Sequence, residues 1–334
     1  MKLIIPMAGM GKRMRPHTLT TPKPLIKIAG KPIVQRLIED IATSVEEPIE
    51  EVGFVIGNFS DQVKANLLEI ADSMEIKGKI YVQNEPLGTA HAIYQAKEML
   101  SGKVIVAFAD TLFITDTQFK LDSDAVIWTK KVDNPQAYGV VILDENNKVK
   151  AFVEKPQEPV SDLAIIGIYY FSKGEALKEE IEYLLDNNIM VKGEYQLTDA
   201  LENLLNKGTE FTTATIDKWL DCGNKNVTVN TNTEILNKLG SQISPEANIE
   251  NSIIIDPVYI GPGATLTNSV IGPHVSIEGN STIKNSVIEK TIIQENTNVS
   301  EAIVKNSMIG AHATVKQKPL DLSISDYSQI SYYE

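Results

Sequence analysis

The hydrophobic pattern of this 334-residue chain changes near residue 240. Before that point, short apolar runs typical of buried strands alternate with segments whose apolar residues recur every three or four positions, the period of a helix that covers a core. This order predicts an α/β domain with a mostly parallel sheet and helices on both faces. The predicted strands are 2–8, 52–57, 79–83, 103–109 and 125–129, and the predicted helices between them are 32–45, 60–74 and 88–101.

The remainder of this first region predicts a further set of strands and helices. Three closely spaced strand patterns fall between 138 and 171, followed by helices at 174–187 and 196–207, a strand near 210–216 and a polar helix at 224–239. Ligands of an open α/β sheet bind at the carboxyl ends of its strands. The loop after the strand 2–8 and Asp110, at the end of the strand 103–109, are both predicted to lie there.

Residues after 243 contain a repeated phrase among small and β-branched residues. An apolar residue about every six positions, separated by small and turn residues, predicts a parallel β-helix of roughly four or five coils. We therefore expect one domain over 1–240 and a hexapeptide-repeat domain over 241–334, with 317–334 capping its open end. The phrase reads ENSII at 250–254, TNSVI at 267–271, KNSVI at 284–288 and KNSMI at 305–309.

Composition narrows the class of protein. Cys222 is the single cysteine, which excludes an intramolecular disulfide and fits a reducing compartment. No apolar run approaches the roughly 18 residues that span a membrane, and the stretch before Pro6 is too short for the core of a signal peptide. We expect a cytoplasmic protein with no membrane partner.

Charge is distributed unevenly along the chain. The net charge of −13 argues against general nucleic-acid binding, which needs a basic face. Residues 1–38 nevertheless contain eight Lys and Arg and no acidic residue, whereas all 44 acidic residues follow. A compact basic segment in an acidic protein indicates a small polyanion, such as a nucleotide, as the ligand.

Two glycines follow the first predicted strand and precede two basic residues. In the run Gly9-Met10-Gly11-Lys12-Arg13, a glycine turn would let backbone N–H groups approach phosphate oxygens, and the Arg13 guanidinium would add a planar charged fork. The run lacks the first glycine and the final Ser or Thr of a Walker A loop. Met14 replaces the third glycine of a dinucleotide fingerprint, so a dehydrogenase is disfavoured. Lys23, ten residues after Arg13, is flanked by two prolines that stiffen its backbone.

Taken together, these motifs resemble the sugar-1-phosphate nucleotidyltransferase family. The resemblance begins with G-x-G-x-R, P-K-P-L and A-G-K-P-I, continues in order along the chain and covers nearly all of 1–240. One departure is Lys12, where many members have Ser or Thr. The further matching motifs are QNEPLGTAHA at 83–92, FAD at 108–110, YGVV at 138–141, VEKP at 153–156, GIY at 167–169 and WLDCG at 219–223.

The resemblance implies a Rossmann-like nucleotidyltransferase domain followed by a short left-handed parallel β-helix. It also implies Mg²⁺ as cofactor, with Asp110 and Asp221 as its ligands. The implied catalytic residues are Arg13, Lys23 and Lys155. The implied nucleotide-binding residues are Ala8, Gly9, Gly11, Arg13, Gln83, Pro86, Gly88 and Thr89, and the implied sugar-phosphate-binding residues are Gly139, Glu154, Lys155, Gly167 and Tyr169.

The implied reaction joins two anions, so positioning and charge neutralisation dominate its catalysis. A sugar 1-phosphate oxygen attacks the α-phosphorus of a nucleoside triphosphate and pyrophosphate leaves. Arg13 would hold the β- and γ-phosphates, Lys23 would lie near the α-phosphate and Lys155 would bind the sugar phosphate. The attacking phosphate is already ionised, so no general base is needed. The Gln83 amide can both donate to and accept from a uracil or thymine edge, whereas His91 is expected to pack and not to catalyse.

Several alternatives remain open. The favoured reaction uses dTTP, with UTP as the other pyrimidine substrate, and transfers to glucose 1-phosphate. Mannose 1-phosphate guanylyl transfer is the nearest alternative, and a non-catalytic regulatory subunit of the same fold is another. For the β-helix we expect a role in homo-oligomer assembly or regulation and not a second, acyltransferase activity.

Overall fold

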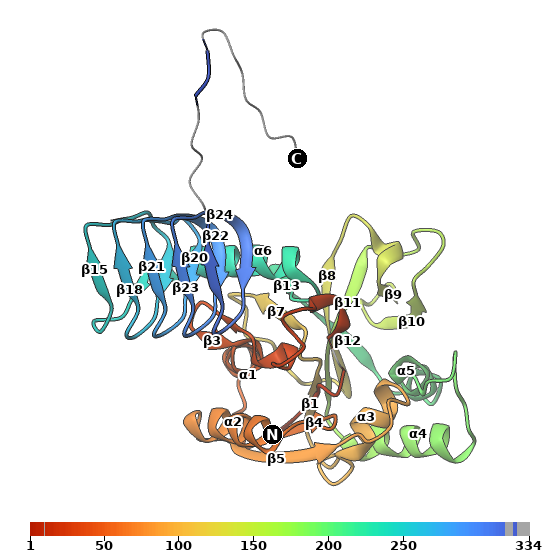
Figure 1. The fold of residues 1–334 in the computed structure, drawn as a ribbon. Coiled ribbons are helices and arrows are strands. Elements are labelled where there is room, and N and C mark those ends of the chain that lie inside the picture. The colour runs from red at the N-terminus through yellow and green to blue at the C-terminus, as the bar shows by residue number, and fades with distance from the viewer. Residues whose placement is uncertain (10, 318–322, 326–334) are drawn as a thin grey trace. The chain divides into compact units, whose positions relative to one another are not determined.

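The computed structural model describes residues 1–9, 11–317 and 323–325, and the chain divides into two compact units, Met1–Thr231 and Asn232–Glu334 (Figure 1). The boundary falls within helix α6 (Lys225–Leu239). The cap expected at 317–334 lies mostly outside the described residues. Each unit is described separately below.

Four adjacent parallel strands form one side of the first unit's main sheet and run out to its edge. They are β5 (Lys77–Val82), β4 (Glu51–Ile56), β1 (Lys2–Pro6) and β6 (Val104–Ala107), in that order. All five residues of β1 pair with β4, and Leu3, Ile4 and Ile5 are fully buried. A strand that is apolar throughout is expected where both faces of a parallel sheet are covered.

The helices of this half follow the strands in the predicted order. The connection from β1 to β4 carries α1 (Ile33–Ser44) and the two-residue strands β2 (Lys27–Ile28) and β3 (Lys31–Pro32). The connection from β4 to β5 is α2 (Asp61–Ser73). Its N-cap is Ser60, whose hydroxyl oxygen accepts a hydrogen bond from the Val63 N–H. Helix α3 (Thr89–Gln95) is shorter than the predicted 88–101, because Ala96–Leu100 continues as hydrogen-bonded turns that still bury Met99 and Leu100.

An antiparallel strand extends the sheet beyond β6. Strand β11 (Leu163–Phe171) pairs with β6 and with β8 (Ala125–Lys131), and β12 (Phe211–Thr215) lies parallel to β8. The β11 register shifts between Ile165 and Tyr169, where Gly167 has a φ of +86°. Before this shift, β11 also pairs with β9 (Gly139–Leu143), which is joined to β10 (Val149–Glu154).

Helices α4 (Gly174–Asp186) and α5 (Leu197–Asn206) pack together with α3 against this sheet. Their buried side chains form one hydrophobic core with side chains of the strands. The predicted fold class, a mixed and mostly parallel α/β sheet followed by a parallel β-helix, is confirmed. Core residues from these elements include Ile4, Val106, Ile127, Phe171, Leu177, Ile181, Leu201 and Leu204.

Two four-residue strands outside the main sheet escape prediction from the sequence. Strands β7 (Thr111–Ile114) and β13 (Lys218–Asp221) form an antiparallel pair in which Asp221 lies opposite Thr111. Two single-turn 3₁₀ helices lie between β1 and β2, η1 (Lys12–Met14) and η2 (Lys23–Leu25), and η3 (Pro135–Ala137) precedes β9.

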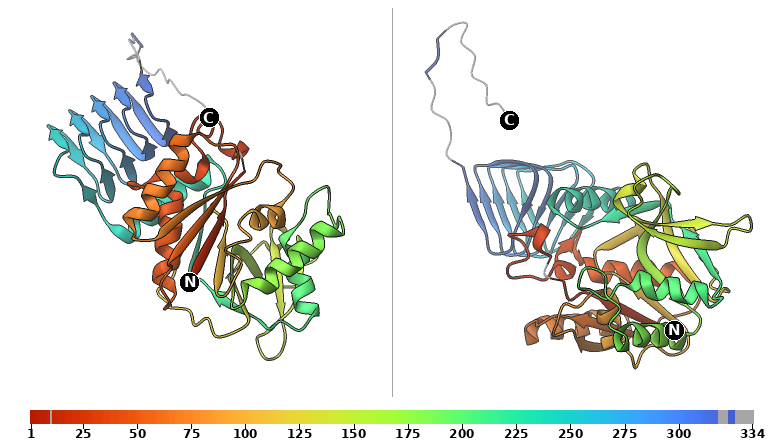
Figure 2. Two further views of the ribbon diagram at one scale, coloured as in Figure 1. Left: turned by 90° about the horizontal axis from the view of Figure 1, so that it is seen from below. Right: turned by 90° about the vertical axis from the view of Figure 1, so that its right-hand side faces the viewer.

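The second unit is a parallel β-helix, with the strands of successive coils stacked side by side (Figure 2). Its stacked inward-facing residues Ile254, Ile271, Ile288 and Val304 belong to a second hydrophobic core. One set of strands consists of β15 (Asn248–Glu250), β18 (Thr265–Thr267), β21 (Thr282–Lys284), β23 (Asn298–Ser300) and β25 (Thr314–Lys316). The other set consists of β14 (Gln242–Ile243), β16 (Ile253–Ile254), β17 (Val258–Ile260), β19 (Val270–Ile271), β20 (Val275–Ile277), β22 (Val287–Ile293) and β24 (Ile303–Ile309).

The register of the coils corrects the reading of the fourth repeat. The first three Asn-Ser phrases stack directly, since Val270 pairs with both Ile253 and Val287. The next partner of Val287 is Ile303, so the phrase at 305–309 aligns with 289–293 and lies after a different corner. Asn285 and Asn306 both have positive φ, which Asn tolerates. The same Asn-Ser phrase therefore marks two kinds of corner.

No helix among the described residues is both long enough and apolar enough to cross a membrane.

We expect Ile288→Ala to lower the free energy of unfolding of the β-helix by ~2–5 kcal/mol, because Ile288 is fully buried in the stacked core. The control is Ile255→Ala, which removes the same atoms from a side chain that is 42% exposed. Chemical denaturation followed by circular dichroism measures both. Equal destabilisation by the two variants would contradict the assignment of the core.

Candidate functional site

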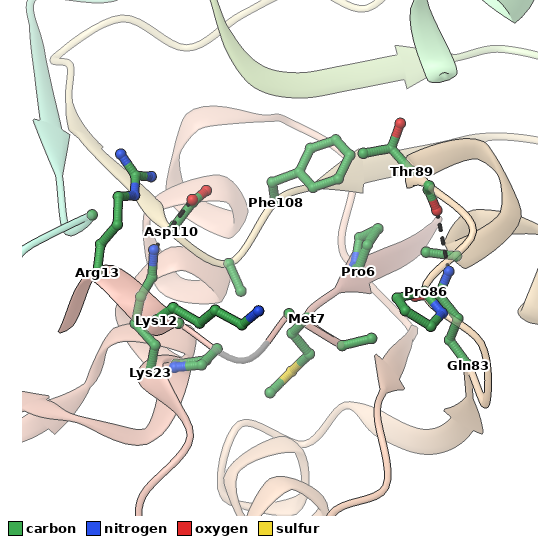
Figure 3. A pocket seen from close by; sticks show the side chains of 18 of the residues that line it. Pro6, Met7, Lys12, Arg13, Lys23, Gln83, Pro86, Thr89, Phe108 and Asp110 are labelled. Atoms are coloured by element: carbon green, nitrogen blue, oxygen red, sulfur yellow. Dashed lines mark hydrogen bonds and ion pairs between the residues drawn. The ribbon is translucent and has the colours of Figure 1, made fainter. Parts of the chain in front are cut away.

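A cavity of about 480 Å³ opens at the carboxyl ends of β1 and β6 (Figure 3). Arg13 and Asp110 lie at one end, Gln83 and Thr89 lie at the other, and Phe108 lies between them. Glycines, prolines and three cationic side chains contribute much of the lining. Of the residues singled out from the sequence, those that line the cavity are Ala8, Gly9, Gly11, Lys12, Arg13, Lys23, Gln83, Pro86, Gly88, Thr89 and Asp110.

The loop after β1 is folded back on itself at the cationic end. Gly11 has a φ of +56°, and its carbonyl accepts a hydrogen bond from the Thr18 hydroxyl at 2.8 Å. A Cβ added to Gly11 would lie 3.1 Å from Thr18 Cγ2 and 3.2 Å from Lys23 Cβ. Glycine at this position therefore allows the positive φ and the close approach of the segment that carries Lys23.

Lys23 is held in place by an ion pair. Its ammonium lies 3.2 Å from Asp110 Oδ2, and its side chain is only 10% exposed. An unpaired cation buried to this degree would cost several kcal/mol, so Asp110 stabilises the position of Lys23. Within the described chain, Lys12 and Arg13 form no ion pair, and Figure 3 shows the Lys12 side chain reaching into the cavity toward Met7. An anionic ligand would therefore meet two uncompensated cations.

The strand pair of β7 and β13 brings the two predicted metal-binding aspartates together. Asp110 immediately precedes β7 and Asp221 ends β13, and the Cys222 N–H donates to the Asp110 carbonyl at 3.1 Å. Asp221 does not itself line the cavity, but Gly223, two residues later, does. A Cβ added to Gly223 would lie 2.9 Å from Asp221 Oδ1 and 3.3 Å from Arg13 Nη2, so both side chains border this glycine.

Cys222, beside Asp221, is fully buried, and burial raises the pKa of its thiol to about 12. A thiol with so high a pKa stays protonated and is a poor nucleophile. The adjacent chain is anchored by α6, because the Thr231 hydroxyl donates to the Asp221 carbonyl at 2.7 Å.

The opposite end of the cavity is organised around Gly88. This residue has a φ of +107°, and an added Cβ would lie 2.4 Å from the Tyr195 carbonyl oxygen. The loop is fastened on both sides, since the Tyr195 N–H donates to the Leu87 carbonyl and the Leu197 N–H donates to the Thr89 hydroxyl. Gln83, only 8% exposed, donates from Nε2 to the Gly88 carbonyl at 3.1 Å.

The predicted sugar-phosphate residues form a separate group on β9, β10 and β11. Gly139 faces Glu154 across the strand pair, and a Cβ added to Gly139 would lie 2.9 Å from Glu154 Oε2. Lys155 has a φ of +46°, is 66% exposed and pairs with Glu154 at 3.3 Å. Tyr169 is buried, and burial together with the charge of Glu154 raises the pKa of its hydroxyl.

This group does not line the cavity, but aromatic side chains connect the two. Phe108, a cavity residue, contacts Tyr169 edge-on with ring centroids 6.4 Å apart, and its N–H donates to the Gly167 carbonyl. Tyr138, next to Gly139, packs on Trp219 of β13 at 4.8 Å. The group therefore adjoins both the cavity and the strand that carries Asp221.

Sequence reasoning missed the segment just before α5. Glu194 lines the cavity, and Tyr195 bonds to the loop that carries Gly88. The one available signal was a glycine followed by polar and aromatic residues, Gly193 to Gln196, at a predicted helix start. Thr18, which bonds to Gly11, was likewise not singled out.

The residues around Asp110 fit a magnesium ion. Two carboxylates approach one end of a cavity whose cations suit phosphate, and Mg²⁺ is usually bound through one or two carboxylates together with substrate phosphates. No group of three or more His, Cys, Asp or Glu side chains arranged to hold a metal occurs among the described residues. Such an ion would consequently depend on phosphate or water oxygens for the rest of its coordination.

Comparison with known families decides the identity of the first unit. Residues 2–238 match the sequence profile described as nucleotidyl transferase, and residues 224–301 match the one described as GlmU-like, C-terminal hexapeptide. The chain belongs to the nucleotidyl transferase family. In this family member, the matched segment contains every residue of the cavity and of the adjoining group.

Individual relatives give the same picture. This nucleotidyl transferase family member is 34% identical over 262 residues to the bifunctional protein GlmU of Methanococcus maripaludis, covering 76% of this chain and 59% of that protein. It is 29% identical to a glucose-1-phosphate thymidylyltransferase of Streptomyces antibioticus, covering 78% and 73% of the two chains. The chain thus spans less than two thirds of the length of the GlmU relatives it matches.

One solved structure supports the fold. A Bacillus anthracis protein provisionally assigned as a glucose-1-phosphate thymidylyltransferase, crystallised with a sucrose, superposes with a TM-score of 0.57. The alignment covers 70% of this chain and 94% of that one at 22% identity, so the likeness concerns the fold alone.

We expect Gly88→Ala to weaken nucleoside triphosphate binding at least tenfold, because the new Cβ would displace either the loop or the Tyr195 backbone. The matched control is Gly102→Ala, which also has a positive φ of +64° but open space around the added atom. Titration calorimetry with a nucleoside triphosphate measures both affinities. Unchanged affinity in Gly88→Ala would show that this loop does not hold the nucleotide.

Proposed function

We propose that this protein transfers a nucleotidyl group from a pyrimidine nucleoside triphosphate to a sugar 1-phosphate, releasing pyrophosphate. The donor that we favour is dTTP, with UTP as the second candidate, and the acceptor is glucose 1-phosphate. The observation that carries the proposal is that the two ends of one cavity differ in their chemical groups. Three cations and Asp110 lie at one end, and the amide of Gln83 lies at the other.

The cationic end suits a triphosphate whose β- and γ-phosphates leave. Arg13 and Lys12, which lack carboxylate partners in the described chain, would neutralise the departing pyrophosphate. Lys23 is stiffer because it is buried and paired, so it would contact the α-phosphate, where charge develops. Lys12 then supplies a charge at the position where many family members carry a hydroxyl.

Asp110 and Asp221 would hold Mg²⁺ at the same end of the cavity. When bound there, the ion would neutralise phosphate charge and align the reacting oxygens. Lys23 would stay beside Asp110 as a second positive group. The Asp221 carboxylate is oriented by a nearby backbone group, since the Gly223 N–H donates to its Oδ1 at 2.7 Å.

The group on β9, β10 and β11 would bind the sugar phosphate. Glu154 would accept hydrogen bonds from sugar hydroxyls, and Gly139 leaves room for the ring beside it. Lys155 is exposed on the adjacent backbone and would bind the phosphate. Tyr169 and Gly167, fixed by Phe108, would form the floor of this subsite.

Two observations favour a pyrimidine over a guanine nucleotide. The Gln83 side chain lines the cavity and bonds to the loop that carries Gly88. The resemblance to the pyrimidine-selecting members implies this combination of a glutamine and a following loop. The relative from Streptomyces antibioticus is named a glucose-1-phosphate thymidylyltransferase, and it matches over 73% of its length. Guanylyl transfer to mannose 1-phosphate is the alternative. The presence of Arg13, Lys23, Asp110, Lys155 and Asp221 argues against a non-catalytic subunit.

We expect Mg²⁺-dependent pyrophosphate release to be fastest with dTTP and glucose 1-phosphate when nucleotides are screened against hexose 1-phosphates. Asp110→Asn and Asp221→Asn should each lower turnover by about 10²-fold or more, the effect of removing one electrostatic contact at a reacting group. Asp61→Asn, an exposed carboxylate on α2, is the control. No pyrophosphate release from any pair would disprove the transferase function, whereas a preference for GTP with mannose 1-phosphate would select the alternative.

We further propose that the β-helix mediates homo-oligomer assembly. Outward-facing Ile253, Val287 and Ile303 are 63%, 45% and 75% exposed and stack, with Val270 among them, as one apolar row. Contiguous exposed apolar side chains favour burial against another surface. The functional domains implied by this division are 1–240 for catalysis and 241–334 for assembly.

We expect the double variant Val287→Lys and Ile303→Lys to sediment as a smaller species than the wild-type protein, because two charges would interrupt the apolar row. The control Thr282→Lys places a charge on another exposed face of the β-helix. Analytical ultracentrifugation distinguishes the species, and an unchanged sedimentation coefficient in the double variant would argue against this interface.

A further inference from the structure

His91, in the first turn of α3, lies between two glutamine side chains. Its Nδ1 is 3.1 Å from Gln83 Nε2, and its Nε2 is 3.1 Å from Gln95 Nε2. Gln83 lines the cavity, whereas His91 and Gln95 do not. His91 therefore touches the residue proposed to recognise the base without reaching the base itself.

The hydrogen bonds of Gln83 fix the orientation of its amide. The amide nitrogen carries two hydrogens, and two groups face it: the Gly88 carbonyl at 3.1 Å and His91 Nδ1. A carbonyl oxygen can only accept, so the nitrogen must be the atom that faces Gly88. Its second hydrogen is satisfied only if His91 Nδ1 is unprotonated. Gln83 Oε1 accepts no hydrogen bond within the described chain and is not sealed from solvent, so it remains available to a ligand.

The Gln95 amide nitrogen also faces a nitrogen of the His91 ring. The surroundings of the two glutamines decide from which of them the ring accepts a hydrogen bond. The Gln95 nitrogen faces His91 Nε2 and also the His91 carbonyl at 3.0 Å, but a neutral imidazole has only one unprotonated nitrogen. Gln83 is 8% exposed, and His91 Nδ1 is the partner that the described chain offers to its second amide hydrogen, whereas Gln95 is only half-buried and also donates to the His91 carbonyl. We therefore assign the accepting nitrogen to Nδ1. The hydrogen on Nε2 then faces Gln95, whose amide accepts it only by rotating and giving up its bond to the His91 carbonyl.

The charge state of His91 agrees with this assignment. Burial lowers the pKa of His91 below its ordinary value, while the carboxylate and the carbonyl of Glu85 act in the opposite direction. The first effect is the larger, so the ring is neutral at neutral pH. A protonated ring would place an N–H against the Gln83 amide nitrogen and break the bond.

We propose that His91 is a positioning residue for base recognition: by accepting from Gln83 at Nδ1, it keeps the Gln83 carbonyl oxygen available in the cavity as a hydrogen-bond acceptor. This inference rests on the nucleotidyl transfer proposed above and extends it to the origin of base selectivity. His91 does not contact the reacting atoms.

The orientation selects a chemical class of base. An acceptor at Gln83 Oε1 matches the imino N–H of uracil, thymine or guanine. The Gly88 N–H bonds to no described residue, so it can donate to the base carbonyl beside that imino group. Cytosine presents an unprotonated ring nitrogen and an amino group along the same edge. A rotated Gln83 amide would accept cytosine instead, so loss of the His91 contact should reduce discrimination between UTP and CTP.

The experiment compares three substitutions of His91 in the full-length protein. Asn places an oxygen where Nδ1 stands, Gln places its amide near Nε2, and Leu provides neither acceptor. Titration calorimetry gives the affinities for UTP and CTP, which differ only at the edge in question. Inorganic tripolyphosphate, bound by the cationic end alone, reports whether the cavity is intact.

We expect wild-type protein and His91→Asn to prefer UTP over CTP by similar factors, within about threefold of each other. In His91→Leu and His91→Gln this preference should fall at least tenfold, with tripolyphosphate affinity unchanged. A preference that survives in His91→Leu, or that falls equally in the Asn and Leu variants, would overturn the proposal, as would a wild-type protein that binds both nucleotides equally. Because binding is measured directly, a protein that selects UTP but releases no pyrophosphate would refute the transferase function and leave the role of His91 standing.

Discussion

The antiparallel pairing of β7 with β13 is the constraint on which the cationic end of the cavity depends. It places Asp221 opposite Thr111 and therefore beside Asp110, more than 100 positions earlier in the chain. Asp110 in turn fixes Lys23, whose burial would be unfavourable without that partner. The Asp221 loop borders Arg13 through Gly223. One four-residue pairing thus sets the positions of two carboxylates and two cations, a mixture of charge suited to phosphate and to a divalent cation.

The other end of the cavity depends on close backbone approach. Gly88 adopts a positive φ and lies against the Tyr195 carbonyl, where any side chain would collide. The segment before α5 holds this loop through backbone bonds at Leu87 and Thr89. The fixed Gly88 carbonyl accepts from the Gln83 amide nitrogen and so orients the Gln83 amide, which in turn contacts His91 Nδ1. In the proposed function, the Gly88 end would discriminate between bases by hydrogen-bond direction, whereas the cationic end would attract any polyphosphate, so selectivity and affinity would be separated in space.

Much of the fold follows from local pattern, and the exceptions have identifiable causes. The long strands and helices of the first unit were predicted because their apolar periodicity is regular over many residues. Strands β7 and β13 were missed because four residues carry too little periodicity to be recognised. Helix α3 was predicted too long, because the turns after Gln95 keep burying Met99 and Leu100 at helical spacing. In the β-helix, identical Asn-Ser phrases serve two kinds of corner, and only the register at Ile303 separates them.

For the site, the sequence by itself determined the chemical groups and their order. The glycines, Arg13, Lys23, Gln83 and the two aspartates were named from motif and resemblance, and all eight residues assigned to the nucleotide do line one cavity. Only the tertiary structure decided which partners hold them. The Lys23–Asp110 pair, the Tyr195 contact with Gly88 and the His91 contact with Gln83 depend on packing and on hydrogen-bond direction. Residue types specify what a side chain can donate or accept, but its direction is fixed by neighbours that the fold supplies.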